Sequence, residues 1–245
     1  MSKDRIYSAP LERVGEFEFD DSVADVFPDM IRRSVPGYSS MLSMIAQCAS
    51  MYAKPHTNIY DLGCSLGAGT LLIRENAVSD STIHAVDNSS AMITRLQEIV
   101  TNQSTKRPDA LPEVNLHLAD IRHIEVSNAS FVVLNLTLQF LAPQDRTPFL
   151  KSVAGGMLDG SALLLSEKVC FEDAEQQNLM TDLHHNFKRA HGYSDLEIAQ
   201  KRTAIENRLI PETMEAHVAR LKAIGFKTVA PWFQCFNFAS ILAVK

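Results

Sequence analysis

The stretch that decides the fold is Ile59-Tyr60-Asp61-Leu62-Gly63-Cys64-Ser65-Leu66-Gly67-Ala68-Gly69-Thr70, with Thr82-Ile83-His84-Ala85-Val86-Asp87-Asn88 after it. A short apolar run ends in Asp61 and breaks into a glycine-rich turn, and a helix is expected to begin near Thr70. The second β-like run ends in another acid, Asp87. A strand, a tight glycine turn, a helix and a second strand that ends in an acid form a pattern with which α/β sheets bind an adenosine ligand.

The spacing of the glycines indicates which ligand. A dinucleotide fingerprint reads G-x-G-x-x-G and rests a pyrophosphate on a helix N-terminus. Here Asp61-x-Gly63-x-Ser65-x-Gly67 resembles instead the D-x-G-x-G-x-G turn of class I S-adenosylmethionine (SAM) dependent methyltransferases, with Ser65 where the middle glycine usually stands. An ordinary βα turn without a ligand is the alternative. The second acid, Asp87, at the end of the next strand favours SAM.

The composition excludes several other classes of protein. Of 245 residues, 46% are hydrophobic and 21% charged, which is an ordinary globular balance. The formal net charge of −6 indicates no direct contact with nucleic acid. The four cysteines are scattered without a C-x-x-C pair, which argues against zinc and against a disulfide framework. No signal-like segment opens the chain and no apolar run reaches membrane-spanning length, so we expect a cytoplasmic protein without a membrane partner.

The order of the predicted elements indicates the fold class. Strands expected at 58–61, 82–87, 114–119, 131–135 and 161–166 alternate with helices, a pattern typical of parallel strands with right-handed crossovers. Two further runs, 227–234 and 236–244, predict an antiparallel hairpin at the sheet edge, after a helix from about 211 to 224. We therefore predict an α/β fold with a Rossmann-like class I methyltransferase sheet, mostly parallel and with a C-terminal antiparallel strand.

Two segments lie outside this alternation, although we expect one domain over residues 1–245. The N-terminal helices fall within residues 1–53, and Ser39 or Ser40 is expected to cap the second of them. Residues 167–210 predict an insertion of two or three helices, which could be a lid, a dimer surface or both. Its histidines, His184, His185 and His191, have no partners at ligand spacing. We interpret them as surface or packing residues and predict no metal site.

Polar residues stand at the ends of successive predicted strands, where an open α/β sheet binds its ligand. The turn would contact the amino-acid end of SAM, Asp87 and Asn88 the ribose, and the residues after the third strand the adenine. The candidates for SAM binding are Gly63, Cys64, Ser65, Asp87, Asn88, Asp120, Ile121 and Asn135. No general base can be chosen, since Asn135-Leu136-Thr137-Leu138-Gln139-Phe140 lacks the prolines of an Asn-Pro-Pro-aromatic motif. The residues alone indicate a SAM-binding α/β enzyme of unknown acceptor.

Several long and unusual runs resemble one family. They include Val26-Phe27-Pro28-Asp29-Met30-Ile31, Arg33-Ser34-Val35-Pro36-Gly37-Tyr38, Thr137-Leu138-Gln139-Phe140-Leu141, Gln200-Lys201-Arg202 and Trp232-Phe233-Gln234-Cys235-Phe236-Asn237-Phe238. Together with the glycine turn they span nearly the whole chain and resemble the carboxy-S-adenosyl-L-methionine (carboxy-SAM) synthases of tRNA wobble-uridine modification. Ser65 in the middle of the turn belongs to the pattern of that family.

This resemblance implies an enzyme that transfers no methyl group. It would convert SAM and prephenate to carboxy-SAM and phenylpyruvate, with SAM as a substrate and no metal. Prephenate would lose carbon dioxide and hydroxide; the hydroxide would deprotonate the SAM methyl, and the resulting ylide would capture the carbon dioxide. The product would pass to a tRNA carboxymethyltransferase that modifies 5-hydroxyuridine, so this protein itself need not bind RNA. The resemblance also implies a homodimer.

The family's ligand contacts, carried onto matching positions, add two residues to the candidates. They are Tyr38 and Arg202, and the resemblance implies that Arg202 pairs with the new carboxylate as the catalytic residue. The residues alone would not separate Arg202 from Arg189 or Arg208. Two alternatives remain: an ordinary SAM methyltransferase, which would methylate an acceptor and ignore prephenate, and a SAM-sensing module without turnover.

Overall fold

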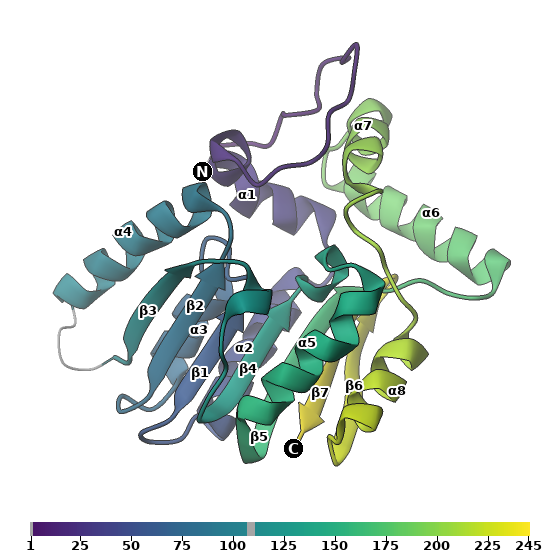
Figure 1. Cartoon of the computed structure of the whole chain (residues 1–245). Helices are drawn as coiled ribbons and strands as arrows, with labels where there is room; N and C mark the ends of the chain where they lie inside the picture. Colours follow the sequence, from purple (N-terminus) through teal and green to yellow (C-terminus); the bar gives the residue numbers. More distant parts are fainter. Residues whose placement is uncertain (1, 107–110) are drawn as a thin grey trace.

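The computed structural model describes residues 2–106 and 111–245 and is built on one seven-stranded sheet. The strand order is β3-β2-β1-β4-β5-β7-β6 (Figure 1). Only β7 runs antiparallel to its neighbours, and it lies between β5 and the edge strand β6. The predicted fold class is therefore confirmed. The strands are β1 (Asn58–Leu62), β2 (Thr82–Asp87), β3 (Glu113–Leu118), β4 (Ala129–Asn135), β5 (Met157–Lys168), β6 (Thr228–Cys235) and β7 (Phe238–Val244).

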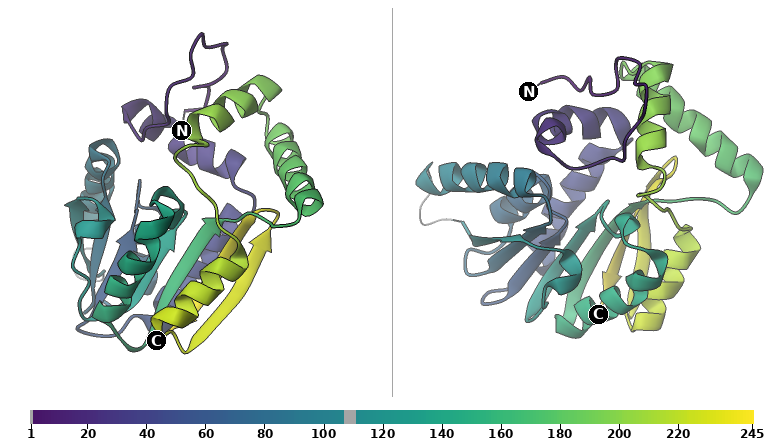
Figure 2. Two further views of the ribbon diagram at one scale, coloured as in Figure 1. Left: turned by 45° about the vertical axis from the view of Figure 1, so that its right-hand side comes forward. Right: turned by 45° about the horizontal axis from the view of Figure 1, so that its top comes forward.

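Helices cover both faces of the sheet. One face packs on α2 (Tyr38–Tyr52), α3 (Ala68–Asn76) and α4 (Ser90–Lys106), and the other on α5 (Pro143–Gly156) and α8 (Met214–Ile224). Both faces of the inner strands are apolar, as expected for parallel strands that are buried on both sides. The remaining helices are α1 (Asp21–Ser34), α6 (Ala174–Ala190) and α7 (Asp195–Ile205), which lie beyond the carboxyl ends of the strands (Figures 1 and 2).

One predicted helix cap is wrong. The N-cap of α2 is Gly37, which makes no side-chain cap bond, and Ser39 and Ser40 lie inside the helix. Gly37 adopts a left-handed φ of 74°, and a Cβ there would come within 2.3 Å of the Phe233 ring. The helix therefore begins at the turn, where only glycine fits both the left-handed φ and the close approach of β6. The two serines follow this position and do not cap the helix. Likewise Thr213 caps α8, so that helix begins at Met214 and not near Pro211.

The insertion between β5 and α8 contains two α-helices in the described chain, α6 and α7. It packs on the N-terminal segment through polar contacts: the Gln200 amide donates to the carbonyls of Tyr7 and Ala9, at 2.9 Å each, and Arg33 Nε donates to the His191 carbonyl at 2.7 Å. The N-terminal segment, α1 and the insertion thus form a layer above the sheet edge (Figure 2). Among the described helices, none has the length and apolar character that crossing a membrane requires.

Candidate SAM site

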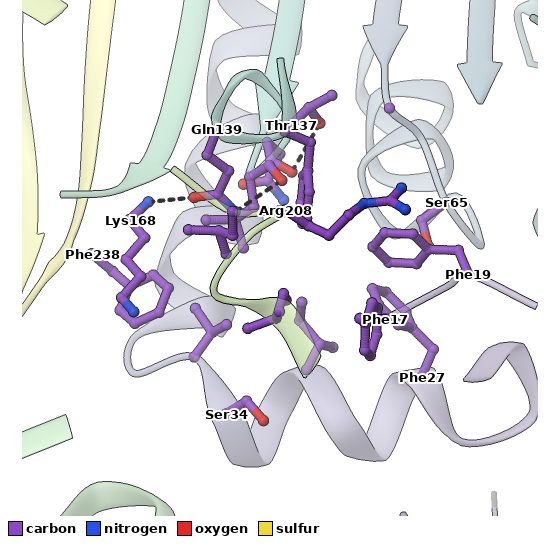
Figure 3. Close-up of a pocket in the computed structure, with 18 of the residues that line it drawn as sticks. Phe17, Phe19, Phe27, Ser34, Ser65, Thr137, Gln139, Lys168, Arg208 and Phe238 are labelled. Atoms are coloured by element: carbon purple, nitrogen blue, oxygen red, sulfur yellow. Dashed lines mark hydrogen bonds between the residues drawn. The ribbon is translucent and has the colours of Figure 1, made fainter. Parts of the chain in front are cut away.

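A cavity of about 730 Å³ opens at the carboxyl ends of the central strands, where the strand order reverses. Its walls come from those strand ends and from α1, α6 and α7. The structure brings all ten predicted ligand residues to this cavity, although their contact with a ligand stays a prediction: Tyr38, Gly63, Cys64, Ser65, Asp87, Asn88, Asp120, Ile121, Asn135 and Arg202. Figure 3 shows part of the lining.

The glycine turn is held in a conformation that requires its residue types. Gly63 has φ 86°, and a Cβ there would lie 2.2 Å from Thr137 Oγ1. Ser65 adopts a left-handed φ of 50°, an uncommon conformation for a residue with a side chain. Such local strain clusters at functional sites because the surrounding structure must support it.

At residues 63–65 of the turn the N–H groups are already used within the protein. Gly63 and Cys64 both donate to the Val86 carbonyl, at 2.8 and 3.0 Å, and Ser65 donates to Asp87 Oδ2 at 2.8 Å. A ligand would therefore meet carbonyl oxygens of this turn. These oxygens suit an ammonium group, which is a donor without acceptor capacity.

Two carboxyls of different function stand beside the turn. Asp87 Oδ1 and Oδ2 each accept one backbone N–H, from Ser89 and Ser65, and each oxygen keeps a lone pair for a ribose hydroxyl. Burial raises the pKa of Asp87. Asp61 is 2% exposed and accepts from Thr70 Oγ1 at 2.6 Å, and burial raises its pKa to about 6. Asp61 thus supports the turn, whereas Asp87 faces the ligand space.

The residues predicted for adenine and for the end of the fourth strand differ in whether the protein already supplies their hydrogen-bond partners. Asp120 accepts from Arg122 Nη2 at 2.7 Å, and this guanidinium also contacts Asp145 at 3.2 Å. An adenine amine would have to share the Asp120 carboxylate with Arg122. Asn135 differs, since its Oδ1 is buried without a hydrogen-bond partner in the described chain. A buried acceptor without a partner is costly, so Asn135 fits a site that a donor of the ligand completes.

Sequence reasoning missed two groups of lining residues. Phe17, Phe19 and Phe27 gather at the end of the cavity near Ser65, and Lys168 and Phe238 lie at the other end (Figure 3). The second group is polar and comes mainly from the insertion: Lys168, His184, His185, Lys188, Lys201 and Arg208. The alternation in Phe17-Glu18-Phe19 is a weak signal of an apolar face, and no spacing in the sequence signals the basic group.

The histidines of the insertion only partly follow the prediction. His191 is exposed, and His184 packs edge-on against Phe238 with 5.1 Å between ring centroids. His184 Nε2 donates to the Ser34 carbonyl at 2.8 Å, and burial lowers its pKa to about 2. Both His184 and His185 nevertheless line the cavity, which was not expected. In the described residues no three His, Cys, Asp or Glu side chains group as metal ligands would.

The structure separates the three arginines that the sequence left equivalent. Arg189 pairs with Asp195 at 2.7 Å and is absent from the described lining of the cavity. Arg202 and Arg208 both line it. Arg208 lies 3.6 Å from Glu16, whereas Arg202 is 66% exposed and its nearest acid is Glu206 at 3.9 Å. The structure thus excludes Arg189 from the described lining, and of the two arginines that remain Arg202 has the longer ion pair and the more exposed side chain.

Comparison with known proteins gives the family. A methyltransferase-domain model matches residues 59–157. The carboxy-S-adenosyl-L-methionine synthase of Aliivibrio fischeri is 51% identical over 243 residues, which cover 99% of this chain and 98% of the relative. The enzyme of the same name from Vibrio vulnificus is 52% identical, with 99% and 97% covered. The chain belongs to the carboxy-S-adenosyl-L-methionine synthase family. This confirms the predicted family and, with it, an enzyme that has SAM as a substrate.

Solved structures support the fold of this carboxy-SAM synthase family member. Magnesium protoporphyrin IX methyltransferase from Synechocystis, with bound S-adenosylhomocysteine, has a TM-score of 0.59 at 13% identity, over 94% of this chain and 89% of that one. A cyclopropane synthase from Mycobacterium tuberculosis has a TM-score of 0.56 at 16% identity, over 78% and 62%. At these identities the likeness shows the class I methyltransferase fold alone.

The geometry of Asp87 leads to a testable expectation. Asp87→Ala should weaken SAM binding at least about tenfold, because each charge-assisted bond to a ribose hydroxyl contributes roughly 1.5–3 kcal/mol. Calorimetric titration of SAM measures this loss. Asp80→Ala, in an exposed loop at the opposite end of β2, is the matched control and should bind SAM normally. Unchanged affinity in a folded Asp87→Ala protein would remove Asp87 from the site.

Proposed function

We propose that the protein makes carboxy-SAM from SAM and prephenate and releases phenylpyruvate. The observation that carries this proposal is full-length membership in the carboxy-SAM synthase family. It is supported by one cavity that is lined both by the predicted SAM residues and by basic residues. In that cavity the glycine turn, Asp87 and Asn135 supply acceptors for SAM. The basic residues at the other end of the cavity supply positive charge for an anionic second substrate.

The chemistry balances without a base from the protein. Loss of carbon dioxide and hydroxide converts prephenate to phenylpyruvate; hydroxide takes one methyl proton to give water, and the methyl carbon binds the carbon dioxide. The acids that line the cavity agree with this scheme. Asp61, Asp87, Asp120 and Asp145 each accept a hydrogen bond from the protein, and Glu206 is the remaining acid of the described lining. In this scheme the substrate supplies the base itself.

Arg202 is proposed to receive the new carboxylate. Arg202 lines the cavity from α7, and its one ion pair in the described chain, with Glu206 at 3.9 Å, is long and exposed to solvent. The planar fork of arginine can pair with a carboxylate through two parallel hydrogen bonds. Arg202 would thus hold the transferred group and favour the product over SAM.

Turnover with purified protein, SAM and prephenate tests the proposed function. Mass spectrometry should find a nucleoside that is heavier than SAM by one carbon dioxide, together with phenylpyruvate. Omission of prephenate should abolish both products. Accumulation of S-adenosylhomocysteine with a methylated acceptor would favour an ordinary methyltransferase, and ligand binding without any turnover would favour a sensing module.

We further propose that the protein supplies a tRNA carboxymethyltransferase in the cytosol, where tRNA is found, and acts as a homodimer. The insertion supports the dimer because it carries exposed apolar side chains, Leu179 at 55% and Leu196 at 39% exposure. A second subunit that covers these leucines would remove apolar surface from water, which is favourable. This basis is independent of the catalytic proposal.

The dimer is expected to dissociate when the insertion is made polar. The double variant Leu179→Glu, Leu196→Glu should shift the mass measured by light scattering from two chains to one, because charges at a buried apolar contact are strongly unfavourable. Met51→Glu, at a 72% exposed position on α2, is the matched control and should stay dimeric. A monomeric wild-type protein would contradict the proposal directly.

A further inference from the structure

Three lysines of the cavity have no carboxylate partner. Lys168 ends β5, Lys188 lies on α6 and Lys201 lies on α7, and all three are partly buried residues of the lining. In the described part of the chain, no ion pair joins any of the three ammonium groups to an acid. Lys201 Nζ has a neutral partner, Ser34 Oγ at 3.1 Å. The charges that shift the pKa of Lys168 and Lys188 are all positive, whereas Asp4 offsets part of the effect at Lys201. Partly buried cations in such surroundings are unfavourable unless a ligand neutralises them.

The pKa values of the three lysines are lowered by burial and by neighbouring charges. Burial, together with the charges of Lys201 and Lys168, lowers the pKa of Lys188 to about 7. Burial also lowers the pKa of Lys201, to about 8, and that of Lys168. The nearest histidine on α6, His184, is kept neutral partly by Lys188 and Lys168. Lys188 therefore lies within range of the charges of both other lysines, and all three side chains line one cavity.

SAM does not account for this charge. SAM carries a sulfonium, an ammonium and one carboxylate, so its net charge is positive, and its acceptors are found at the glycine turn and Asp87. A single carboxylate also cannot match three lysines in addition to Arg202. Lys168 lies at the end of the cavity away from the phenylalanines and Ser65 (Figure 3), and its charge and that of Lys201 act on Lys188. The charge pattern calls for a second ligand with at least two negative charges.

We propose that Lys168, Lys188 and Lys201 form a subsite that binds the two carboxylates of a dianionic second substrate beside SAM. The inference rests on the proposed function, which supplies prephenate as that substrate, but it assigns the binding to residues for which the family resemblance implied no role. Lys168 and Lys188 make no hydrogen bond through Nζ in the described structure and are expected to contribute most. Lys201, already held by Ser34 and 5.7 Å above the Tyr193 ring, is expected to contribute less.

Binding without reaction tests the subsite separately from turnover. Protein saturated with S-adenosylhomocysteine lacks the reactive methyl, so calorimetric titration with prephenate reports affinity alone. Lys168→Gln and Lys188→Gln should each weaken prephenate binding by about 10- to 100-fold, since each removes a charged hydrogen bond. Lys188→Arg should restore part of the loss. Binding of S-adenosylhomocysteine itself should change less than about threefold, because its contacts lie elsewhere.

The control and the charge series make the outcome specific. Lys222→Gln, at an exposed position on α8 outside the cavity lining, should behave as wild type. Phenylpyruvate, with one carboxylate, should be affected much less by the lysine variants than prephenate, which a merely structural defect would not produce. Wild-type affinity for prephenate in folded Lys168→Gln and Lys188→Gln proteins would overturn the subsite. If wild type binds prephenate through these lysines but gives no turnover, the proposed function fails while the subsite stands.

Discussion

Arg146→Ala is expected to destabilise the folded protein by about 3–5 kcal/mol, because it removes a buried guanidinium and leaves the acceptors that it satisfies without their donor. The Arg146 side chain is 0% exposed. Its guanidinium pairs with Glu212 and donates to the carbonyls of Leu141 at 3.0 Å and Ile210 at 2.7 Å. One side chain of α5 thereby ties the loop after β4 to the segment that leaves the insertion, and both line the cavity.

Urea denaturation measures the loss in the free energy of unfolding. Lys151→Ala, an exposed position on the same helix, is the matched control and should change stability by less than about 0.5 kcal/mol. A loss below about 1 kcal/mol for Arg146→Ala would show that solvent replaces the network at little cost. In that case Arg146 would not connect the insertion to the sheet.

The same network predicts a pH dependence. Burial alone would raise the pKa of Glu212, but hydrogen bonds and charges from Arg220 and Arg146 lower it below its ordinary value of 4.5. A carboxyl whose pKa is lower in the folded than in the unfolded state stabilises the protein above its unfolded pKa and loses that contribution as the pH falls. As the pH falls from about 5 to below 4.5, wild type should therefore lose more stability in urea denaturation than Arg146→Ala, in which Glu212 has one cation fewer.

The elements that the sequence predicted best have a clear apolar run and a glycine or an acid at one end. The strand 82–87 was predicted without error, and the helix expected to begin near Thr70 begins at Ala68. The fifth strand was predicted at 161–166 but runs from Met157 to Lys168. Its start is polar and exposed at Asp159 and Gly160, so hydrophobicity could not mark it.

The residues of the site also differ in how far the sequence could predict them. Strand-end residues such as Asp87 and Asn135 could be predicted, since the topology alone brings the carboxyl ends of parallel strands together. Glu167 could not: it is 2% exposed and accepts the backbone N–H groups of Leu138 and Gln139, and burial raises its pKa to about 8. In the sequence it is an acid at the start of a charged insertion. Only packing shows that it holds the short helix η2 (Leu138–Phe140) against the sheet.

The basic residues of the cavity were missed for a related reason. Lys168, Lys188 and Lys201 come from three elements, and nothing in their spacing relates them. Arg202 entered through a family resemblance, and the residues around it gave no reason to prefer it to Arg208. Convergence of distant charges is a tertiary property that follows from how α6 and α7 close over the sheet edge.

Arg202→Ala is expected to weaken the binding of carboxy-SAM much more than the binding of SAM. The product places a carboxylate where SAM has only the methyl of a sulfonium, so the guanidinium has a charge to bind in the product alone. Binding of carboxy-SAM should weaken by roughly 2–4 kcal/mol, with a much smaller loss for SAM. Arg202→Lys should recover only part of the loss, since an ammonium cannot form the bidentate pair. Calorimetric titration of the two nucleosides on each variant measures the difference.

The size of the loss also reports how the site closes. With its side chain 66% exposed in the single chain, Arg202 would contribute less than about 1 kcal/mol to an ion pair left open to solvent. A loss of 2–4 kcal/mol therefore requires that the ligand, the basic wall or a second subunit excludes water from the pair. Arg208→Ala, from the neighbouring cation of the same cavity, is the matched control and should not discriminate between the nucleosides. Equal and normal binding of both nucleosides by Arg202→Ala would remove Arg202 from the reaction.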